Sequence, residues 1–326
     1  MEYERNLIEL GKKETAMLSW SSEGVLTVGL SNGAVQLYES GELTAVLGKH
    51  SKAVSSIAWS PNGEFLATGA RDNTIILWKQ DKEEAVLKGH TGPIYQVAWS
   101  PDSEILASCS GDKSVLLWRG EKPLTKMVGH TGAVTSLSWS PNSKLLASGS
   151  ADSTVRLWNR DGTVEAVLEG HTKALARVAW HPEIDSKLLA SSAYDFNVRL
   201  WKGGKEHALL EGHKDRVFGL TWSPDGRTLA SGGGFKDADI RLWNREGASI
   251  AVLKGHTSSI YQLKWRPQGD ILASSSFDST VRLWRENQEI TTLTGLKGPA
   301  LGLDWSPDGQ SIASAGTGKV GVWTLQ

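Results

Sequence analysis

The sequence predicts an all-β fold, an eight-bladed β-propeller in which each blade is a sheet of four antiparallel strands. Three observations lead to this prediction: two regular series of tryptophans, a repeat period that fits one blade, and strand-like alternation within each repeat. The 326-residue chain contains 15 tryptophans, and all of them belong to one series or the other. The first series is Trp20, Trp59, Trp99, Trp139, Trp180, Trp222, Trp265 and Trp305. The second is Trp78, Trp118, Trp158, Trp201, Trp243, Trp284 and Trp323, with Tyr38 in the vacant first place.

The repeat period gives the number of blades. Seven steps lead from Trp20 to Trp305, so the mean spacing is about 41 residues. A period of ~40–45 residues with several short strands per unit is the signature of a propeller blade. Eight such units account for the whole chain, and we therefore expect residues 1–326 to form a single domain.

The alternation of residue types within a unit predicts its four strands. Residues 133–139 (AVTSLSW) alternate apolar and small polar side chains, as a half-buried strand does. Further strands are predicted at 145–150, 154–158 and 164–168. Turns that contain Pro, Asn, Asp or Gly separate them.

The order of short motifs in each unit resembles the WD-repeat family. A typical unit reads Gly-His, then a Trp before a Ser-Pro-Asn or Ser-Pro-Asp turn, then Leu-Ala-Ser, Asp and a strand that ends in Trp. The Trp-Asp dipeptide that names the family does not occur, because Lys, Arg, Asn or Thr follows each second-series Trp. The resemblance covers essentially the whole chain and implies a protein-interaction scaffold that acts within larger assemblies.

The resemblance also implies how the ring closes. Each Gly-His would lie between the outer strand of one blade and the inner strand of the next. The last strand, 319–325, is then the third strand of blade eight. We expect the N-terminal segment at about residues 3–10 to supply the fourth strand, which would cover sheet edges that could otherwise pair with another chain.

Six units carry a matching set of four residues. A Ser-His-Asp set can serve hydrolysis, but a set repeated in six equivalent places is not a single catalytic pocket. The resemblance implies a buried hydrogen-bond chain, from Trp to Ser or Thr to His to Asp, that satisfies these groups away from water. We expect no catalytic residue and no metal site, since the histidines lie in different blades. The sets are His50, Thr68, Asp72, Trp78; His90, Ser108, Asp112, Trp118; His130, Ser148, Asp152, Trp158; His171, Ser191, Asp195, Trp201; His213, Ser231, Asp237, Trp243; and His256, Ser274, Asp278, Trp284.

Blades one and eight depart from this set. Blade one has Lys13 or a neighbouring residue in place of His and Asn32 in place of Asp, and blade eight has Leu296 in place of His. Terminal repeats are often atypical, so we predict that local opening is easiest at the junction of these two blades. His181 and His207 fall outside the pattern, and we expect both in surface loops.

A partner would contact positions that differ between units. Family geometry implies two such positions per blade around one mouth of the central channel: one four residues before the first-series Trp, the other directly before the turn Asp. In blades five to seven four of these six positions are aromatic, Lys236 is a fifth, and Arg216 lies two residues before Phe218. Aromatic residues with arginine are the usual hot-spot chemistry of protein interfaces. We predict a surface that binds a protein or peptide and consists of Tyr95, Tyr194, Arg216, Phe218, Lys236, Tyr261, Phe277 and Arg71. The alternative is that these aromatic rings only plug the channel mouth.

Composition argues against several other functions. The net charge is −1 and the predicted surface holds few cations, so we do not expect a nucleic-acid partner. No apolar run approaches the ~18–20 residues that cross a bilayer, and we expect no membrane partner. The single cysteine, Cys109, is expected to be a small buried residue, and no Cys-x-x-Cys-His motif is present for haem.

These observations favour a non-catalytic scaffold without cofactors. We expect it to be monomeric and cytoplasmic, with the nucleus as the alternative in a eukaryotic cell. The alternative functions are a structural or engineered propeller with no native ligand and a nucleic-acid-associated adaptor. A longer turn in blade six, residues 232–239 with three consecutive glycines, is expected to be decoration of the repeat.

Overall fold

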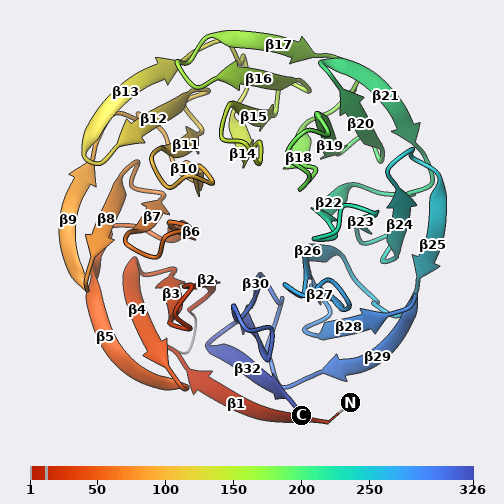
Figure 1. The fold of residues 1–326 in the computed structure, drawn as a ribbon. Coiled ribbons are helices and arrows are strands. Elements are labelled where there is room, and N and C mark those ends of the chain that lie inside the picture. Colours follow the sequence, from red (N-terminus) through yellow and green to blue (C-terminus); the bar gives the residue numbers. More distant parts are fainter. Residues whose placement is uncertain (1, 12–13) are drawn as a thin grey trace.

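The computed structural model describes residues 2–11 and 14–326. In these two ranges, 32 strands form eight four-stranded antiparallel sheets, and there is no helix. The sheets stand around a centre as the blades of a propeller (Figure 1). The predicted fold class is confirmed.

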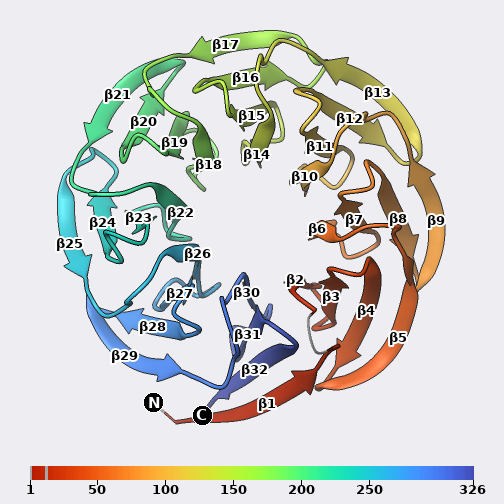
Figure 2. The ribbon, with the colours of Figure 1, turned by 180° about the vertical axis from the view of Figure 1, so that it is seen from behind.

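The inner two strands of each blade follow the sequence motifs. Each innermost strand faces the centre of the ring and ends at a first-series Trp. The blades follow one another clockwise in Figure 1 and, seen from behind, counter-clockwise in Figure 2. The innermost strands are β2 (Ala16–Trp20), β6 (Val54–Trp59), β10 (Ile94–Trp99), β14 (Val134–Trp139), β18 (Leu175–Trp180), β22 (Val217–Trp222), β26 (Ile260–Trp265) and β30 (Gly302–Trp305). The second strands are β3 (Leu26–Leu30), β7 (Leu66–Ala70), β11 (Leu106–Ser110), β15 (Leu145–Ser150), β19 (Leu188–Ala193), β23 (Thr228–Gly233), β27 (Leu272–Ser276) and β31 (Ser311–Gly316). Apart from the first residue of β15, β23 and β31, the second strands are buried throughout, which explains their small residues.

The outer two strands are less uniform. The third strands carry the second-series Trp, and they are β4 (Ala34–Glu39), β8 (Ile75–Lys79), β12 (Val115–Arg119), β16 (Val155–Asn159), β20 (Val198–Lys202), β24 (Ile240–Asn244), β28 (Val281–Arg285) and β32 (Lys319–Leu325). The outer strands are β5 (Glu42–Lys49), β9 (Lys82–Leu87), β13 (Lys122–Met127), β17 (Val164–Leu168), β21 (Lys205–Leu210), β25 (Ser249–Leu253), β29 (Gln288–Leu293) and β1 (Tyr3–Glu9). The outer strands of blades one to seven are mostly exposed, with buried or half-buried residues at intervals, because one of their faces meets water.

The N-terminal strand closes the ring as predicted. β1 pairs antiparallel with β32 from Tyr3–Leu325 to Glu9–Lys319 and completes the sheet of blade eight. Both chain ends therefore lie at this blade (Figure 1). Ile8 is buried in a cluster that also holds Val320 of blade eight and Val28 of blade one, so β1 contributes to the packing between the two blades.

Apolar clusters between neighbouring blades form the core. One of them joins Cys109 and Met127 of blade three to Leu137, Trp139 and Trp158 of blade four. Cys109 is fully buried, as expected, and burial raises the pKa of its thiol to about 12, so it remains a protonated packing residue.

His181 begins the loop between β18 and β19, but its side chain is buried, so the expectation of a surface position was wrong. It takes the place of the Ser that follows the first-series Trp in most blades, and only 1% of it is exposed. Its Nε2–H donates to the Gly226 carbonyl of blade six at 2.8 Å, and its ring meets Trp222 edge-on with the centroids 4.8 Å apart. The imidazole therefore links two blades, a contact between residues 45 positions apart that the motif could not reveal. His207 is exposed, as expected, but it lies in strand β21 and not in a loop.

Candidate functional site

The four matched residues form one hydrogen-bond chain in each of blades two to seven. In blade four, the Trp158 Nε1–H donates to the Ser148 hydroxyl at 2.7 Å. The hydroxyl lies 2.8 Å from His130 Nε2, and His130 Nδ1 lies 2.8 Å from Asp152 Oδ2. Across the six blades the indole–hydroxyl distance is 2.7–2.9 Å and the hydroxyl–imidazole distance 2.8–2.9 Å.

The carboxylate of each chain also holds the turns at the end of the blade. Asp152 Oδ2 accepts the Thr131 N–H at 2.9 Å, and Oδ1 accepts both the N–H and the hydroxyl of Thr154. Burial by itself would raise the pKa of the Asp152 carboxyl, but these hydrogen bonds and nearby His130 outweigh it and lower the pKa to about 2. Burial lowers the pKa of the His130 imidazole. At neutral pH the pair is therefore a carboxylate and a neutral imidazole whose Nδ1–H donates.

This arrangement has the order of a hydrolytic triad but no access for a substrate. The Ser148 side chain is fully buried, and its oxygen already accepts the Trp158 N–H. A nucleophilic hydroxyl must reach the reacting carbon of a substrate. Ser148 cannot do so without unfolding of the blade. The other five hydroxyls are likewise fully buried.

Blades one and eight lack this chain. Lys13 lies outside the described residues, but the neighbouring Glu14 accepts the Ser31 hydroxyl at 2.6 Å and the Asn32 N–H at 3.0 Å. Glu14 thus holds the turn of blade one, a role that its position outside the motif did not indicate. In blade eight the Trp323 indole is fully buried, and its N–H has no partner among the described residues.

Hydrogen exchange should be fastest at the junction of blades one and eight. A buried polar group without a partner costs about 1–3 kcal/mol. The Trp20 indole N–H at this junction has no partner among the described residues, and neither has that of Trp323, which belongs to blade eight and packs against blade seven. We expect amides of β2, β3, β31 and β32 to exchange before those of the corresponding strands in blades three and four. Mass spectrometry of the intact protein in D2O would measure this. Faster exchange in blades three and four would contradict the prediction.

The face that carries the predicted partner surface is defined by two kinds of connection. The upper face carries the connections between blades and the turns between second and third strands. Hydrogen bonds such as that from the Arg71 N–H to the Ala53 carbonyl join a connection to the turn beside it. The opposite face, here called lower, carries the other turns. Arg71 of blade two and Tyr95 of blade three lie across the ring from blades six and seven (Figure 1). Tyr95 is 39% exposed.

A β-bulge presents one residue of the inner strand at the upper face of blades two to seven. The register between first and second strands shifts by one residue at Ser55, Tyr95, Thr135, Ala176, Phe218 and Tyr261. These are the positions four residues before the first-series Trp. Bulges re-aim side chains next to functional sites, and here the bulge turns one residue per blade out of the normal alternation. In blade one the pairing is regular, and Ala16 is buried.

The structure brings four of the predicted residues together in two aromatic pairs. Tyr194 of blade five meets Phe218 of blade six edge-to-face, with centroids 5.6 Å apart. Tyr261 and Phe277, both of blade seven, meet in the same way at 5.9 Å. We call Tyr194, Phe218, Tyr261 and Phe277 the aromatic sector. The Arg216 guanidinium lies over the Tyr194 ring, 5.0 Å from its centroid.

The longer turn of blade six stands beside this sector. Phe235 is 70% exposed, and Lys236 follows it. Asp215 holds the turn, because its Oδ2 accepts the Lys236 N–H at 3.0 Å while its Oδ1 accepts the Arg216 N–H at 2.8 Å. Nothing in the repeat pattern singled out Asp215, whose role depends on a contact 21 residues along the chain.

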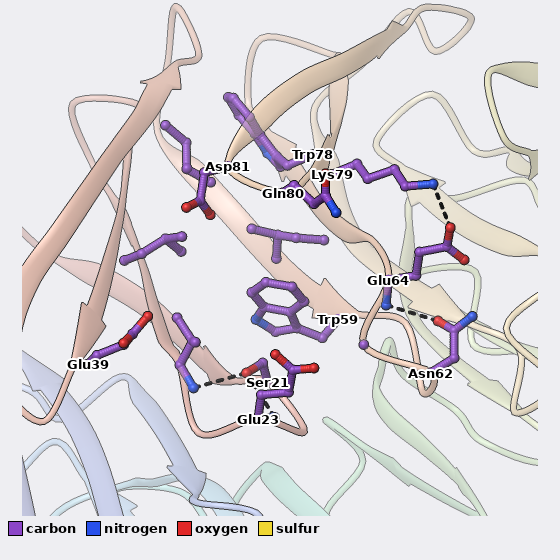
Figure 3. Close-up of a pocket in the computed structure, with 15 residues that line it drawn as sticks. Ser21, Glu23, Glu39, Trp59, Asn62, Glu64, Trp78, Lys79, Gln80 and Asp81 are labelled. Carbon is purple, nitrogen blue, oxygen red and sulfur yellow. Dashed lines mark hydrogen bonds and ion pairs between the residues drawn. The ribbon is translucent and has the colours of Figure 1, made fainter.

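A separate cleft opens on the lower face between blades one and two (Figure 3). It has a volume of about 620 Å³, and carboxylates of Glu23, Glu39 and Asp81 line it beside the Trp59 ring. Lys79 also lies at the cleft, but it pairs with Glu64 at 2.6 Å. Water can satisfy carboxylates around an open cleft, so this lining alone selects no ligand.

Comparison with known proteins agrees with the geometry. A family model described as the IFT122 first beta-propeller matches residues 14–209, and one described as WD domain, G-beta repeat matches residues 204–244, 247–285 and 287–324. No curated protein matches the sequence. Among the described residues, no helix has the length and apolar character needed to cross a membrane, and no group of His, Cys, Asp and Glu is arranged to hold a metal ion.

Proposed function

The chain belongs to the WD-repeat β-propellers, in the family of the IFT122 first beta-propeller, and we propose that it is a non-catalytic scaffold that binds a peptide or a loop of another protein on its upper face. Propellers of this family generally serve as scaffolds for protein interaction. We place the binding surface at the aromatic sector and at Arg216 and Lys236, with Tyr95 and Arg71 as contacts on the far side of the channel.

One observation supports this location above the others: the aromatic pairs lie side by side in sequence order on blades five to seven, on one face. Rings that only filled the channel mouth would be covered by their neighbours. Phe277 is instead 44% exposed, and Phe235 beside the sector is 70% exposed. Exposed aromatic rings with arginine are the side chains that contribute most to binding energy in protein interfaces.

We propose a structural role for the six hydrogen-bond chains. Each lies within one blade and satisfies buried polar groups that would otherwise oppose folding. We also propose that the scaffold is a monomeric single domain that acts in the cytoplasm. The closed ring supports a monomer, because β1 covers the edge of blade eight that could otherwise pair with a second copy.

Alanine at both Phe218 and Tyr261 should remove partner binding without unfolding the protein. Loss of hot-spot side chains costs ~2 kcal/mol each or more, so we expect the affinity to fall by well over 100-fold. The measurement is affinity purification from a lysate with quantitative mass spectrometry, with circular dichroism to confirm the fold. Ile184→Ala is the matched control, since Ile184 is 61% exposed in a turn of the lower face. Equal recovery of the same proteins by the double variant and by wild type would refute this surface.

A further inference from the structure

We propose that the partner segment is acidic and carries an apolar side chain, and that the blade-six turn at residues 234–239 grips it with Phe235 and Lys236. This inference rests on the proposed function, because it assigns a chemistry to the ligand of the same upper face. It also assigns a binding role to a turn that the sequence pattern treats as decoration.

The first argument is that four cationic side chains near the aromatic sector have no ion-pair partner in the part of the chain that the structure describes. Lys173, Lys214, Arg216 and Lys236 are all exposed on blades five and six, and none forms an ion pair with a described carboxylate. Two of these cations instead lie over aromatic rings: Lys173 over Phe196, 5.1 Å from its centroid, and Arg216 over Tyr194.

Several cations elsewhere on the ring have ion-pair partners. Arg160 bridges Asp102 and Glu104, Lys264 pairs with Asp304, and Arg199 and Arg282 pair with Glu206 and Glu289. Asp215 lies close to Arg216 and Lys236, but its carboxylate accepts their backbone N–H groups and forms no ion pair with their side chains. A ligand with carboxylates would supply ion-pair partners for these exposed cations.

The second argument is the preformed shape of the turn. Besides the bond to Asp215, the Asp237 N–H donates to the Gly234 carbonyl at 3.0 Å, and the Gly233 N–H donates to the Asp239 carbonyl at 3.1 Å. A Cβ at Gly234 would lie 2.8 Å from Asp215 Oδ2, so a larger residue there would displace the carboxylate that holds the turn. Asp237 also belongs to the hydrogen-bond chain of blade six, at 2.5 Å from His213 Nδ1.

The anchored turn holds an exposed phenyl ring out from the face. Phe235 would lose little conformational freedom on binding, since its backbone is already fixed at both sides. The ring gives an apolar contact next to Lys236, and the aromatic sector offers further apolar surface. Together they suit an extended peptide in which acidic residues alternate with or flank an aromatic or leucine side chain.

The same residues fit a peptide better than a nucleic acid. Bases bind by stacking on open ring faces, but the Arg216 guanidinium covers one face of Tyr194, and Phe218 meets that ring edge-to-face. Tyr261 and Phe277 also meet edge-to-face. A net charge of −1 gives the whole chain no general attraction to phosphate.

Selection from a random dodecapeptide phage library on the immobilised full chain tests the proposal. We expect enriched peptides with a net negative charge and at least one Phe, Trp or Leu. A fluorescein-labelled copy of the most enriched peptide should bind at least ~10-fold more weakly to Phe235→Ala and to Lys236→Glu, and more weakly in 500 mM than in 50 mM salt. Lys144→Glu is the matched control, because it makes the same charge change on an exposed lower turn and should alter the affinity less than twofold.

The outcomes separate this inference from the proposed function. Enriched peptides that are neutral or basic overturn it, as does binding that Phe235→Ala and Lys236→Glu leave unchanged. If, in either case, the Phe218→Ala/Tyr261→Ala variant no longer binds the enriched peptide, the upper-face binding surface is supported and only the acidic-peptide inference fails. If no peptide is enriched, or if enriched peptides bind all variants equally, both fail. Binding of a labelled 20-mer of thymidylate that Lys236→Glu abolishes, without peptide binding, would replace the peptide by a nucleic acid.

Discussion

Replacing Asp152 with alanine should lower the free energy of unfolding by about 3–5 kcal/mol, because several donors lose a charged acceptor and each loss costs about 1–3 kcal/mol. The substitution removes the acceptor for the His130 Nδ1–H, the Thr131 N–H and the Thr154 N–H and hydroxyl. His130 is buried, so its Nδ1–H would be left without a partner in the blade. Urea unfolding followed by tryptophan fluorescence measures the loss, and we expect similar values for Asp112→Ala and Asp278→Ala.

Asp161 provides a matched control in the same blade. It accepts two hydrogen bonds from Thr163, just as Asp152 does from Thr154, but it lies exposed in the turn between β16 and β17. Water can replace it, so Asp161→Ala should cost less than about 1 kcal/mol. Equal losses for the two variants would mean that the buried chain adds nothing beyond an ordinary turn.

The strand order and the closure of the ring could be predicted because the same strand pattern recurs in eight repeats. Evenly spaced tryptophans mark the ends of first and third strands, and a missing fourth strand at the C-terminus requires a donor at the N-terminus. The β1–β32 pairing meets that requirement. Errors in any one unit are corrected by comparison with the others.

Features that depend on contacts unique to one blade could not be predicted in this way. In the motif, His181 replaces the Ser of a turn. It is buried because its ring fits against Gly226 of the next blade and donates a hydrogen bond to the Gly226 carbonyl. Glu14 and Asp215 hold turns whose N–H groups come from 18 and 21 residues further along. The bulge that presents Phe218 and Tyr261 also leaves no mark in the alternation of the inner strand.

The molecule separates residues that hold the ring from residues that differ between blades. The hydrogen-bond chains use the buried Ser or Thr of the second strand and the Trp of the third, and the bulged residue of the first strand takes no part in them. Bulged positions can therefore carry Thr, Ala, Phe or Tyr without loss of the blade. This separation is why we expect Phe218 and Tyr261 to tolerate alanine and Asp152 not to.

Removal of residues 1–10 should open the ring and lower the melting temperature by about 10 °C or more. The truncated chain would lose all pairing between β1 and β32 and the buried side chain of Ile8. Loss of a buried aliphatic side chain alone costs about 2–5 kcal/mol, and each kcal/mol corresponds to roughly 2–4 °C in a large domain. Differential scanning calorimetry gives the shift, and light scattering should show aggregation that rises with protein concentration, because β32 would present a free edge.

A synthetic peptide of residues 2–10, added in trans, should restore the melting temperature and suppress the aggregation. Glu4→Ala in the full chain is the control, because Glu4 is exposed and the substitution leaves the backbone pairing with Thr324 intact. A truncated protein that stays monomeric and melts with wild type would show that β1 is dispensable. That result would contradict the role of β1 at this junction, where the buried Ile8 side chain packs in the cluster of blades eight and one and neither blade has a complete His–Asp chain. The two blades therefore depend on β1 for contacts that the other blades obtain from their own residues.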